Sequence, residues 1–130
     1  MPTESTIVRA IIRHLRELPD SWVLKVHGSS FQRRGVPDIL FIWHGRSYAF
    51  EVKCPGKRLT RIQEVEIERL RKAGVLAVVV HNEVDVIHEL MMDPRRAAKT
   101  ESASGAAGKR SQSPDCARPP ILQDERSQQR

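Results

Sequence analysis

The sequence contains only two cysteines and no long apolar run, and these scarcities exclude several classes of protein. Cys54 and Cys116 lie far apart, and no Cys-x-x-Cys or Cys/His spacing suggests a zinc site or a disulfide framework. No apolar stretch approaches the roughly 18 residues that a membrane-spanning helix needs, and the sequence does not begin with an apolar signal segment. We therefore expect a soluble, cytoplasmic protein.

Aromatic residues are also few, at 5% of the chain, and all of them precede residue 91. The branched aliphatic residues are concentrated in the same part, whereas the later sequence consists mainly of Ala, Ser, Lys, Arg, Gln and Pro. Such a segment buries too little apolar surface to offset the entropy lost on ordering it. We interpret residues 1–93 as one domain with a modest core, and residues 94–130 as a low-complexity, disordered basic tail.

The charge balance favours an anionic partner but does not identify one. The formal net charge is +6, and residues 1–90 hold 14 Lys and Arg against 11 Asp and Glu. Many proteins with a modest basic excess bind no nucleic acid, so the charge alone adds only slight support for nucleic-acid binding.

The spacing of apolar residues in the first half predicts one helix and three strands. An amphipathic helix is expected from the N-cap Thr3 to Pro19, and residues 21–28 alternate as a strand. Residues 38–53 read as two β-rich runs, which we expect to form an antiparallel hairpin that turns at residues 44–46.

The second half predicts a helix, a strand and a final helix. Thr60 can cap a helix that ends at Gly74, and the apolar residues 75–80 are expected to form a central strand. In a last helix over residues 83–92, the residues expected on the buried side are Val86, Ile87, Leu90 and Met91. The order α-β-β-β-α-β-α predicts an α/β fold with a small mixed β-sheet flanked by helices, because a helical crossover makes the last two strands parallel.

Two carboxylates and an ammonium group lie in the most hydrophobic part of the sequence, "GVPDILFIWHGRSYAFEVKCPGK". Asp38 begins the first hairpin strand, and Glu51 and Lys53 end the second. Because the start of one hairpin strand faces the end of the other, Asp38 and Glu51 are expected side by side, with Lys53 on the same face as Glu51. Paired carboxylates in apolar surroundings repel each other and are costly to desolvate, so we expect a hard divalent cation, Mg²⁺ or Mn²⁺, to join them. Lys53 could then orient a water molecule and offset charge on a phosphate.

The succession of "GVPD", "EVK" after an apolar strand, and a helix bearing Gln63 resembles the PD-(D/E)XK nuclease superfamily. Within it, the chain most resembles stand-alone VRR-NUC domains of phages and other mobile elements, which are related to Holliday-junction resolvases. The resemblance covers roughly Glu4 to Asp85. It implies a restriction-endonuclease-like core and a divalent-metal-dependent DNA endonuclease in a phage or bacterial host cell, acting on branched DNA such as Holliday junctions. Symmetric resolution of a junction takes two cuts, so we expect a homodimer. No nucleotide cofactor is expected.

The resemblance also assigns roles to individual residues. The residues that it places in catalysis are Asp38, Glu51, Lys53, Gln63 and Glu4. Asp38, Glu51 and the backbone carbonyl of Val52 would hold the metal, and Glu4 would reach it through a water molecule. Lys53 would position the attacking water, while Gln63 would support the site or touch phosphate. A first-turn acid that complements the helix dipole is an equally good interpretation of Glu4.

Polar and basic residues near the predicted site are candidates for DNA contacts. The basic ones are Arg33, Arg34, Lys57, Arg58 and Arg61, which are suited to phosphate oxygens. Ser29 or Ser30 lies where resolvase relatives place a loop serine. The basic residues of the tail could add nonspecific affinity or none.

Each feature also has an ordinary interpretation. Asp38 alone would be a turn aspartate, Glu51 and Lys53 an exposed cross-strand pair, and Gln63 a solvated helix residue. Trp22 and Trp43 are interpreted as core residues, and the five scattered histidines as structural or surface residues. For the whole domain, the alternatives are a catalytically inactive nucleic-acid-binding module with the nuclease fold, and a structural or toxin-neutralising phage protein in which the motif is fortuitous.

Overall fold

The computed structural model of the chain describes residues 1–28 and 33–99. It divides into a compact unit, Met1–Arg95, and a second unit, Arg96–Arg130, of which only residues 96–99 are described. The predicted disordered tail therefore falls almost entirely outside the described residues.

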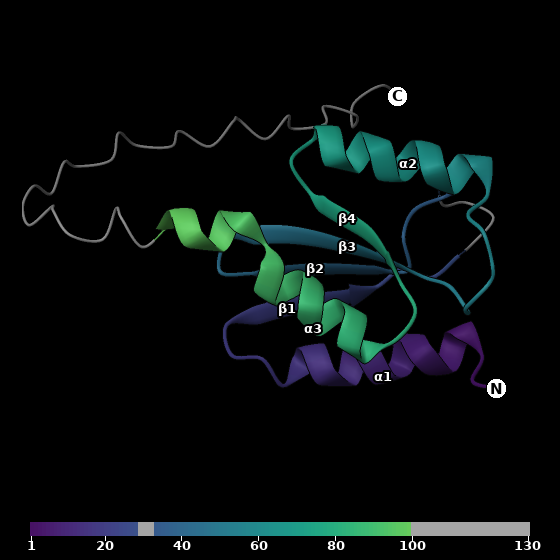
Figure 1. Cartoon of the computed structure of the whole chain (residues 1–130), viewed down its shortest axis with the longest axis horizontal. Coiled ribbons are helices and arrows are strands. Elements are labelled where there is room, and N and C mark those ends of the chain that lie inside the picture. The colour runs from purple at the N-terminus through teal and green to yellow at the C-terminus, as the bar shows by residue number, and fades with distance from the viewer. Residues whose placement is uncertain (29–32, 100–130) are drawn as a thin grey trace, which may run out of the picture. The chain divides into compact units, whose positions relative to one another are not determined.

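The elements follow one another in the predicted order α-β-β-β-α-β-α, which is confirmed (Figure 1). Their bounds are α1 Glu4–Arg16, β1 Ser21–Lys25, β2 Ile39–Trp43, β3 Arg46–Val52, α2 Arg61–Lys72, β4 Leu76–Val80 and α3 Glu83–Met92, followed by a 3₁₀ helix at Pro94–Lys99. The side chains of Thr3 and Thr60 cap α1 and α2 as predicted. None of the helices in the described part of the chain is long and apolar enough to cross a membrane.

The four strands form one mixed sheet in the order β1-β2-β3-β4. The pairs β1–β2 and β2–β3 are antiparallel, whereas β3–β4 is parallel, as the helical crossover predicts. β4 lies at the edge of this sheet and not in its centre, so that part of the prediction is wrong. Its apolar sequence has another cause, because helices cover both faces of β4 and bury Ala77 on one side and Val80 on the other.

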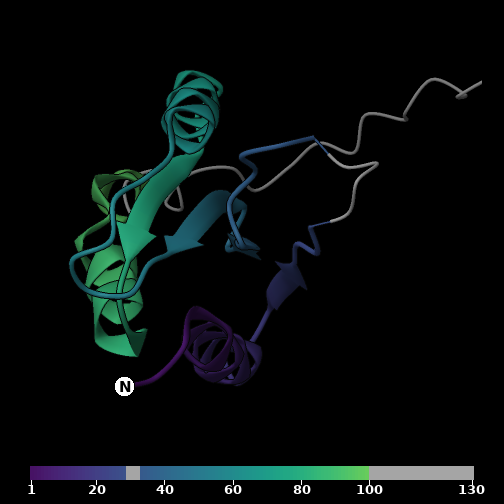
Figure 2. The same cartoon turned by 90° about the vertical axis from the view of Figure 1, so that its right-hand side faces the viewer.

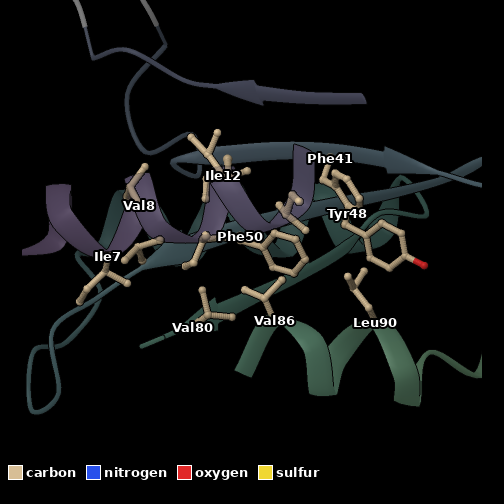
Figure 3. Packing of buried hydrophobic residues seen from close by; sticks show 13 residues of the cluster. Ile7, Val8, Ile12, Phe41, Tyr48, Phe50, Val80, Val86 and Leu90 are labelled. Carbon is tan, nitrogen blue, oxygen red and sulfur yellow. The ribbon is translucent and has the colours of Figure 1, made fainter. Parts of the chain in front are cut away.

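The helices cover the two faces of the sheet unequally (Figures 1 and 2). α1 and α3 pack on one face, where the main core is formed, and α2 packs on the other. Figure 3 shows residues of this core, in which Val86 and Leu90 of α3 point toward Phe50 and Tyr48 of β3. Aromatic side chains fill the centre of this face, since Phe41 and Tyr48 lie 5.8 Å apart between ring centroids. These helices fix the middle of β2 and β3, and leave the strand ends free to carry polar groups.

The β2–β3 hairpin turns on two residues only. His44 and Gly45 both have positive φ, 50° and 72°, the combination that a two-residue type I′ turn requires. The turn was predicted over residues 44–46, but Arg46 already belongs to β3. This tight turn sets the register that pairs Ile39 with Phe50.

Two apolar side chains that were predicted to be buried are exposed. Trp22 is 52% exposed because α2 packs against β4 and leaves the same face of the edge strand β1 uncovered. Met91 is 71% exposed because Val86 and Leu90, one turn apart, already form the buried stripe of α3. Trp43 is half-buried, and its indole N–H donates to the carbonyl oxygen of Pro19 at 3.0 Å.

A buried ion pair holds the end of the domain to the sheet. The carboxylate of Asp93, which is fully buried, accepts hydrogen bonds from the Tyr48 hydroxyl at 2.8 Å and from the Arg95 guanidinium at 2.8 and 2.9 Å. Arg95 also lies over the Tyr48 ring and donates to the carbonyl oxygen of Gly74 at 3.0 Å. These contacts attach the segment after α3 to the beginning of β3.

Candidate active site

Asp38 lies at the end of the sheet where β2 begins and β3 ends. The register that pairs Ile39 with Phe50 puts Asp38 opposite Glu51, as the hairpin predicts. One carboxylate oxygen of Asp38, Oδ2, accepts the backbone N–H of Val52 at 2.8 Å, and its carbonyl oxygen accepts the N–H of Val26 at 2.8 Å. Burial raises the pKa of Asp38, although the Val52 N–H and the charge of Lys53 oppose this.

Glu51 is the most buried acid of the site, with 2% of its surface exposed. Its Oε1 atom accepts the side-chain amide of Gln63 at 2.7 Å and lies 3.5 Å from the ammonium nitrogen of Lys53. Its Oε2 atom is buried and has no hydrogen-bond partner among the described residues. Burial, followed by repulsion from Asp38, raises the pKa of Glu51 to about 7.

The backbone on both sides of the site is fixed by neighbouring elements. The N–H of Lys53 donates to the carbonyl oxygen of Val80 at 3.0 Å, and the carbonyl oxygen of Lys53 contacts Nδ1 of His81 at 2.8 Å. On α2, Gln63 and Thr60 form a capping box, in which the Thr60 N–H donates to Oε1 of Gln63 at 2.9 Å. The capping bond holds the amide of Gln63 so that its NH₂ group faces Glu51.

Glu4 reaches the same region from the first turn of α1. Its Oε1 atom accepts the N–H of Cys54 at 3.4 Å and lies 3.8 Å from the ammonium group of Lys57. Its negative charge contributes to the raised pKa of both Asp38 and Glu51. The structure therefore brings all five predicted catalytic residues to one end of the sheet, from α1, β2, β3 and α2. Val52, the predicted carbonyl ligand, is buried between Glu51 and Lys53.

The predicted DNA-contact residues have different surroundings. Lys57 and Arg58 are exposed in the segment after β3, and Arg34 is exposed before β2. Arg33 and Arg61 are exposed too, but each forms an ion pair, with Glu66 at 3.0 Å and with Glu64 at 3.4 Å. Ser29 and Ser30 lie outside the described residues.

Sequence reasoning missed two residues that shape the site. Glu66 is nearly buried, and its Oε1 atom binds both Arg33 at 3.0 Å and Arg69 at 2.8 Å, which ties the segment before Asp38 to α2. Its position three residues after Gln63, beside the buried Ile67, places it on the sheet-facing side of the helix and could have revealed it. Lys25 was also missed, and its charge is one of those that oppose the rise that burial causes in the pKa of Asp38.

The site offers a small set of donors to a divalent cation. Among residues 1–28 and 33–99, no group of three or more His, Cys, Asp and Glu side chains is arranged to hold a metal ion. The pair Asp38 and Glu51 nevertheless offers oxygen ligands, and the buried Oε2 of Glu51 has no partner in the described part of the chain. Because an unpaired buried carboxylate oxygen is costly, a hard cation at this atom would relieve both its isolation and the repulsion between the two acids. The residues present therefore fit a cation that takes its remaining ligands from backbone, water or substrate.

A comparison with solved structures adds an independent finding. A structure described as a VRR_NUC domain matches with a TM-score of 0.59 and 27% sequence identity, over 69% of this chain and 96% of that chain. Searches of family models and of curated proteins find no match. The mixed sheet, its flanking helices and this likeness define an α/β domain with a nuclease fold. More particularly, this likeness supports a VRR-NUC domain, and that part of the resemblance read from the motif is confirmed.

Proposed function

We propose that the protein is a divalent-cation-dependent endodeoxyribonuclease that hydrolyses phosphodiester bonds in DNA. The observation that carries this proposal is Glu51, a buried carboxylate with one unpartnered oxygen beside a second acid, Asp38, and an ammonium group, Lys53. The burial of such a group destabilises the fold, which favours a functional role for it.

Each residue of the site has a separate task in this proposal. Asp38, Glu51 and the carbonyl oxygen of Val52 would hold Mg²⁺ or Mn²⁺, with Glu4 contributing through water. The chemistry that such a cation supplies is Lewis acidity, which lowers the pKa of a bound water and balances charge on the phosphate. Gln63 and Lys53 both approach Oε1 of Glu51, which leaves Oε2 for the cation.

Lys53 would also act on the substrate side. Its ammonium group is only partly exposed, with 13% of the side chain accessible, and lies 3.5 Å from Oε1 of Glu51. From there it can donate to the attacking water or to a phosphate oxygen as negative charge develops. Asp38 is held by the Val52 N–H through one oxygen, which leaves its second oxygen for the site.

We propose branched DNA, such as a Holliday junction, as the substrate. The unit Met1–Arg95 is accounted for by the nuclease fold and adds no separate sequence-reading module, which favours recognition of shape. One domain carries one site, and two symmetric cuts need two sites, so we propose a homodimer. The open edge of β4 and the exposed α3 residues Val84, Met91 and Met92 are the candidate interfaces. The place of action would be the cytoplasm of a bacterial or phage-infected cell.

The test is a cleavage assay on labelled four-way junction, duplex and single-stranded DNA, with Mg²⁺, Mn²⁺ or a chelator. We expect cation-dependent cleavage, fastest on the junction, that falls at least about 100-fold in Asp38→Asn, Glu51→Gln and Lys53→Ala. Asp38→Asn keeps an oxygen for the Val52 N–H, so it separates chemistry from folding. Lys72→Ala, which removes an exposed cation from the end of α2, is the control and should cleave at the wild-type rate.

The other outcomes identify other functions. Tight junction binding without cleavage in either metal would indicate an inactive binding module. Neither binding nor cleavage would indicate a structural protein. Light scattering on the protein as it elutes from a size-exclusion column measures its mass and so tests for the dimer. A monomeric mass at the concentration of the cleavage assay, together with a single nick per junction, would contradict the dimer.

A further inference from the structure

We propose that the groove between α1 and β1 binds the sugar–phosphate backbone of a DNA strand that continues from the active site. The groove has a volume of about 800 Å³. Its cationic lining comes from Arg9, Arg13 and Arg16 of α1 and from Lys25 at the end of β1, with His27 beside them and Glu17 as its acidic residue. The inference rests on the proposed function, since it extends the path of the same substrate.

The cations of the groove differ from the arginines of α2. Within residues 1–28 and 33–99, no ion pair holds Arg9, Arg13, Arg16 or Lys25. On α2, by contrast, three arginines each pair with a glutamate of the same helix, namely Arg61–Glu64, Arg69–Glu66 and Arg71–Glu68. The charge of α2 is thus largely neutralised from within, and the groove beside α1 retains its positive field for an outside anion.

One end of the groove lies near the active site. Lys25 pairs in the sheet with Ile39, the residue after Asp38. Glu4 marks the same end of α1, because it contacts Cys54 and Lys57 after β3. From this end, α1 runs along the sheet away from the site (Figure 1). Glu51 binds Gln63 of α2 and so lies on the opposite face of the sheet from α1, and a strand seated at the site would pass round this end of the sheet to reach the arginines.

The spacing of the arginines suits a phosphate backbone. Arg9 and Arg16 are seven residues apart, or about 10 Å at 1.5 Å per residue. That length spans about three nucleotides at roughly 3.4 Å per nucleotide of duplex. Arginine also offers a planar fork of donors that binds phosphate through two parallel hydrogen bonds. An α1 face that only needed solubility would gain equally from paired charges of both signs, as on α2.

The experiment measures binding apart from cleavage. The full chain and its variants are titrated onto labelled four-way junction and duplex DNA in a chelator, at about 50 to 200 mM salt, and the dissociation constant is read by fluorescence anisotropy. In Arg13→Ala/Arg16→Ala we expect the slope of log K against log salt to become shallower by about 2, and affinity at low salt to fall about tenfold or more. Arg13→Lys/Arg16→Lys should recover most of the slope because it keeps the charge.

Lys72→Ala is the matched control for single replacements such as Arg13→Ala, since each removes one exposed cation from a helix surface. It should leave slope and affinity unchanged, and thermal melting should show that all variants are folded. Unchanged binding in folded Arg13→Ala/Arg16→Ala would overturn the proposal that the groove binds DNA. If the wild type still cleaves DNA, the proposed function would stand. A wild type that binds through the groove but never cleaves would overturn the proposed function alone. A wild type that binds no DNA would overturn both.

Discussion

The two oxygen atoms of the Glu51 carboxylate lie in different surroundings. Oε1 is near two donors, on Gln63 and Lys53, whereas Oε2 is buried without a partner among the described residues. A carboxylate held in this way is fixed in orientation but remains poorly neutralised. Burying the charge of Glu51 therefore costs folding free energy, and the same arrangement leaves an oxygen atom ready to bind a cation.

Glu51→Gln tests this at the level of stability. In the folded wild type the pKa of Glu51 is raised from its ordinary 4.5 to about 7, so the folded state binds the proton more tightly than the unfolded chain. The free energy of unfolding of the metal-free protein should therefore fall by up to about 3 kcal/mol as pH rises through this window, and then level off. Glu51→Gln should lack this fall. Urea denaturation in a chelator from about pH 4.5 to about pH 8 measures it, and parallel pH profiles of wild type and variant would contradict the prediction.

Gln63 binds Glu51 and also caps α2, and a variant of Thr60, its partner in the cap, can separate the two roles. Gln63→Ala removes both the hydrogen bond to Glu51 and its half of the capping box, so we expect cleavage to fall about tenfold or more and stability to fall by about 1 kcal/mol. Thr60→Ala removes only the hydroxyl that accepts the Gln63 N–H. It should cost similar stability with little loss of cleavage. Equal rates in the two variants would show that Gln63 serves the helix alone.

At the scale of elements, the site depends on the segment that leads from the loop into β2. This segment is tied to α2 by Arg33 and Glu66, and it passes close to Ile62 at Gly35. Because Asp38 follows three residues later, any displacement here moves a proposed metal ligand. The helix α2 thus positions Gln63 directly and Asp38 indirectly.

Gly35→Ala is the sharpest change available in this segment. Gly35 has φ +80°, and a Cβ atom there would lie 2.6 Å from Cγ2 and 2.7 Å from the carbonyl oxygen of Ile62. We expect a loss of about 2 kcal/mol or more together with weaker cleavage, since both backbone strain and a clash with backbone must be relieved. Gly28→Ala is the control, because none of the described residues has an atom within 4 Å of the added methyl group and the φ of Gly28 is not in the left-handed region. Thermal melting of the two variants measures the difference, and equal melting temperatures would contradict the close approach.

The positions of the helices and strands could largely be predicted from the sequence, but which of their faces are buried could not. The apolar stripe of α1, the threonine caps and the hairpin are local patterns, so the meeting of Asp38 with Glu51 followed from a two-strand argument. The exposure of Trp22 could not be predicted in this way. An alternating strand shows that its two faces differ, but which face a helix covers depends on where α2 packs, a contact between distant parts of the chain.

At the scale of the whole domain, the active site and the C-terminal attachment lie at opposite ends of β3. Glu51 ends the strand, whereas Tyr48, near its start, binds Asp93. The Arg95 guanidinium beside Asp93 holds the pKa of that carboxyl well below its usual range. No spacing in the sequence reveals a contact between residues 45 positions apart, and a limit drawn at residue 93 would omit Arg95 from the unit Met1–Arg95.

Arg95→Ala should therefore destabilise the domain far from the site. Removal of the guanidinium leaves the buried Asp93 without its cation, and we expect a loss of about 3 kcal/mol near neutral pH. Because the pKa of Asp93 is lowered in the fold from 3.8, this contribution is present above about pH 4 and is lost as pH falls further, so the variant and wild type should converge in acid. Chemical denaturation at several pH values measures the effect. A constant difference down to low pH would show that the loss has another cause, and Arg95→Lys should lie between the two.

The two tryptophans differ in exposure, and this gives the protein an internal optical reporter. Trp22 is 52% exposed on the uncovered face of β1. Trp43 is less exposed, and its indole N–H donates a hydrogen bond to the carbonyl oxygen of Pro19. A water-soluble quencher should reach the emission of the first more readily than that of the second. With Trp43→Phe or Trp22→Phe, one fluorophore follows events on the sheet surface and the other follows opening of the core, so local and global transitions can be recorded separately in unlabelled protein.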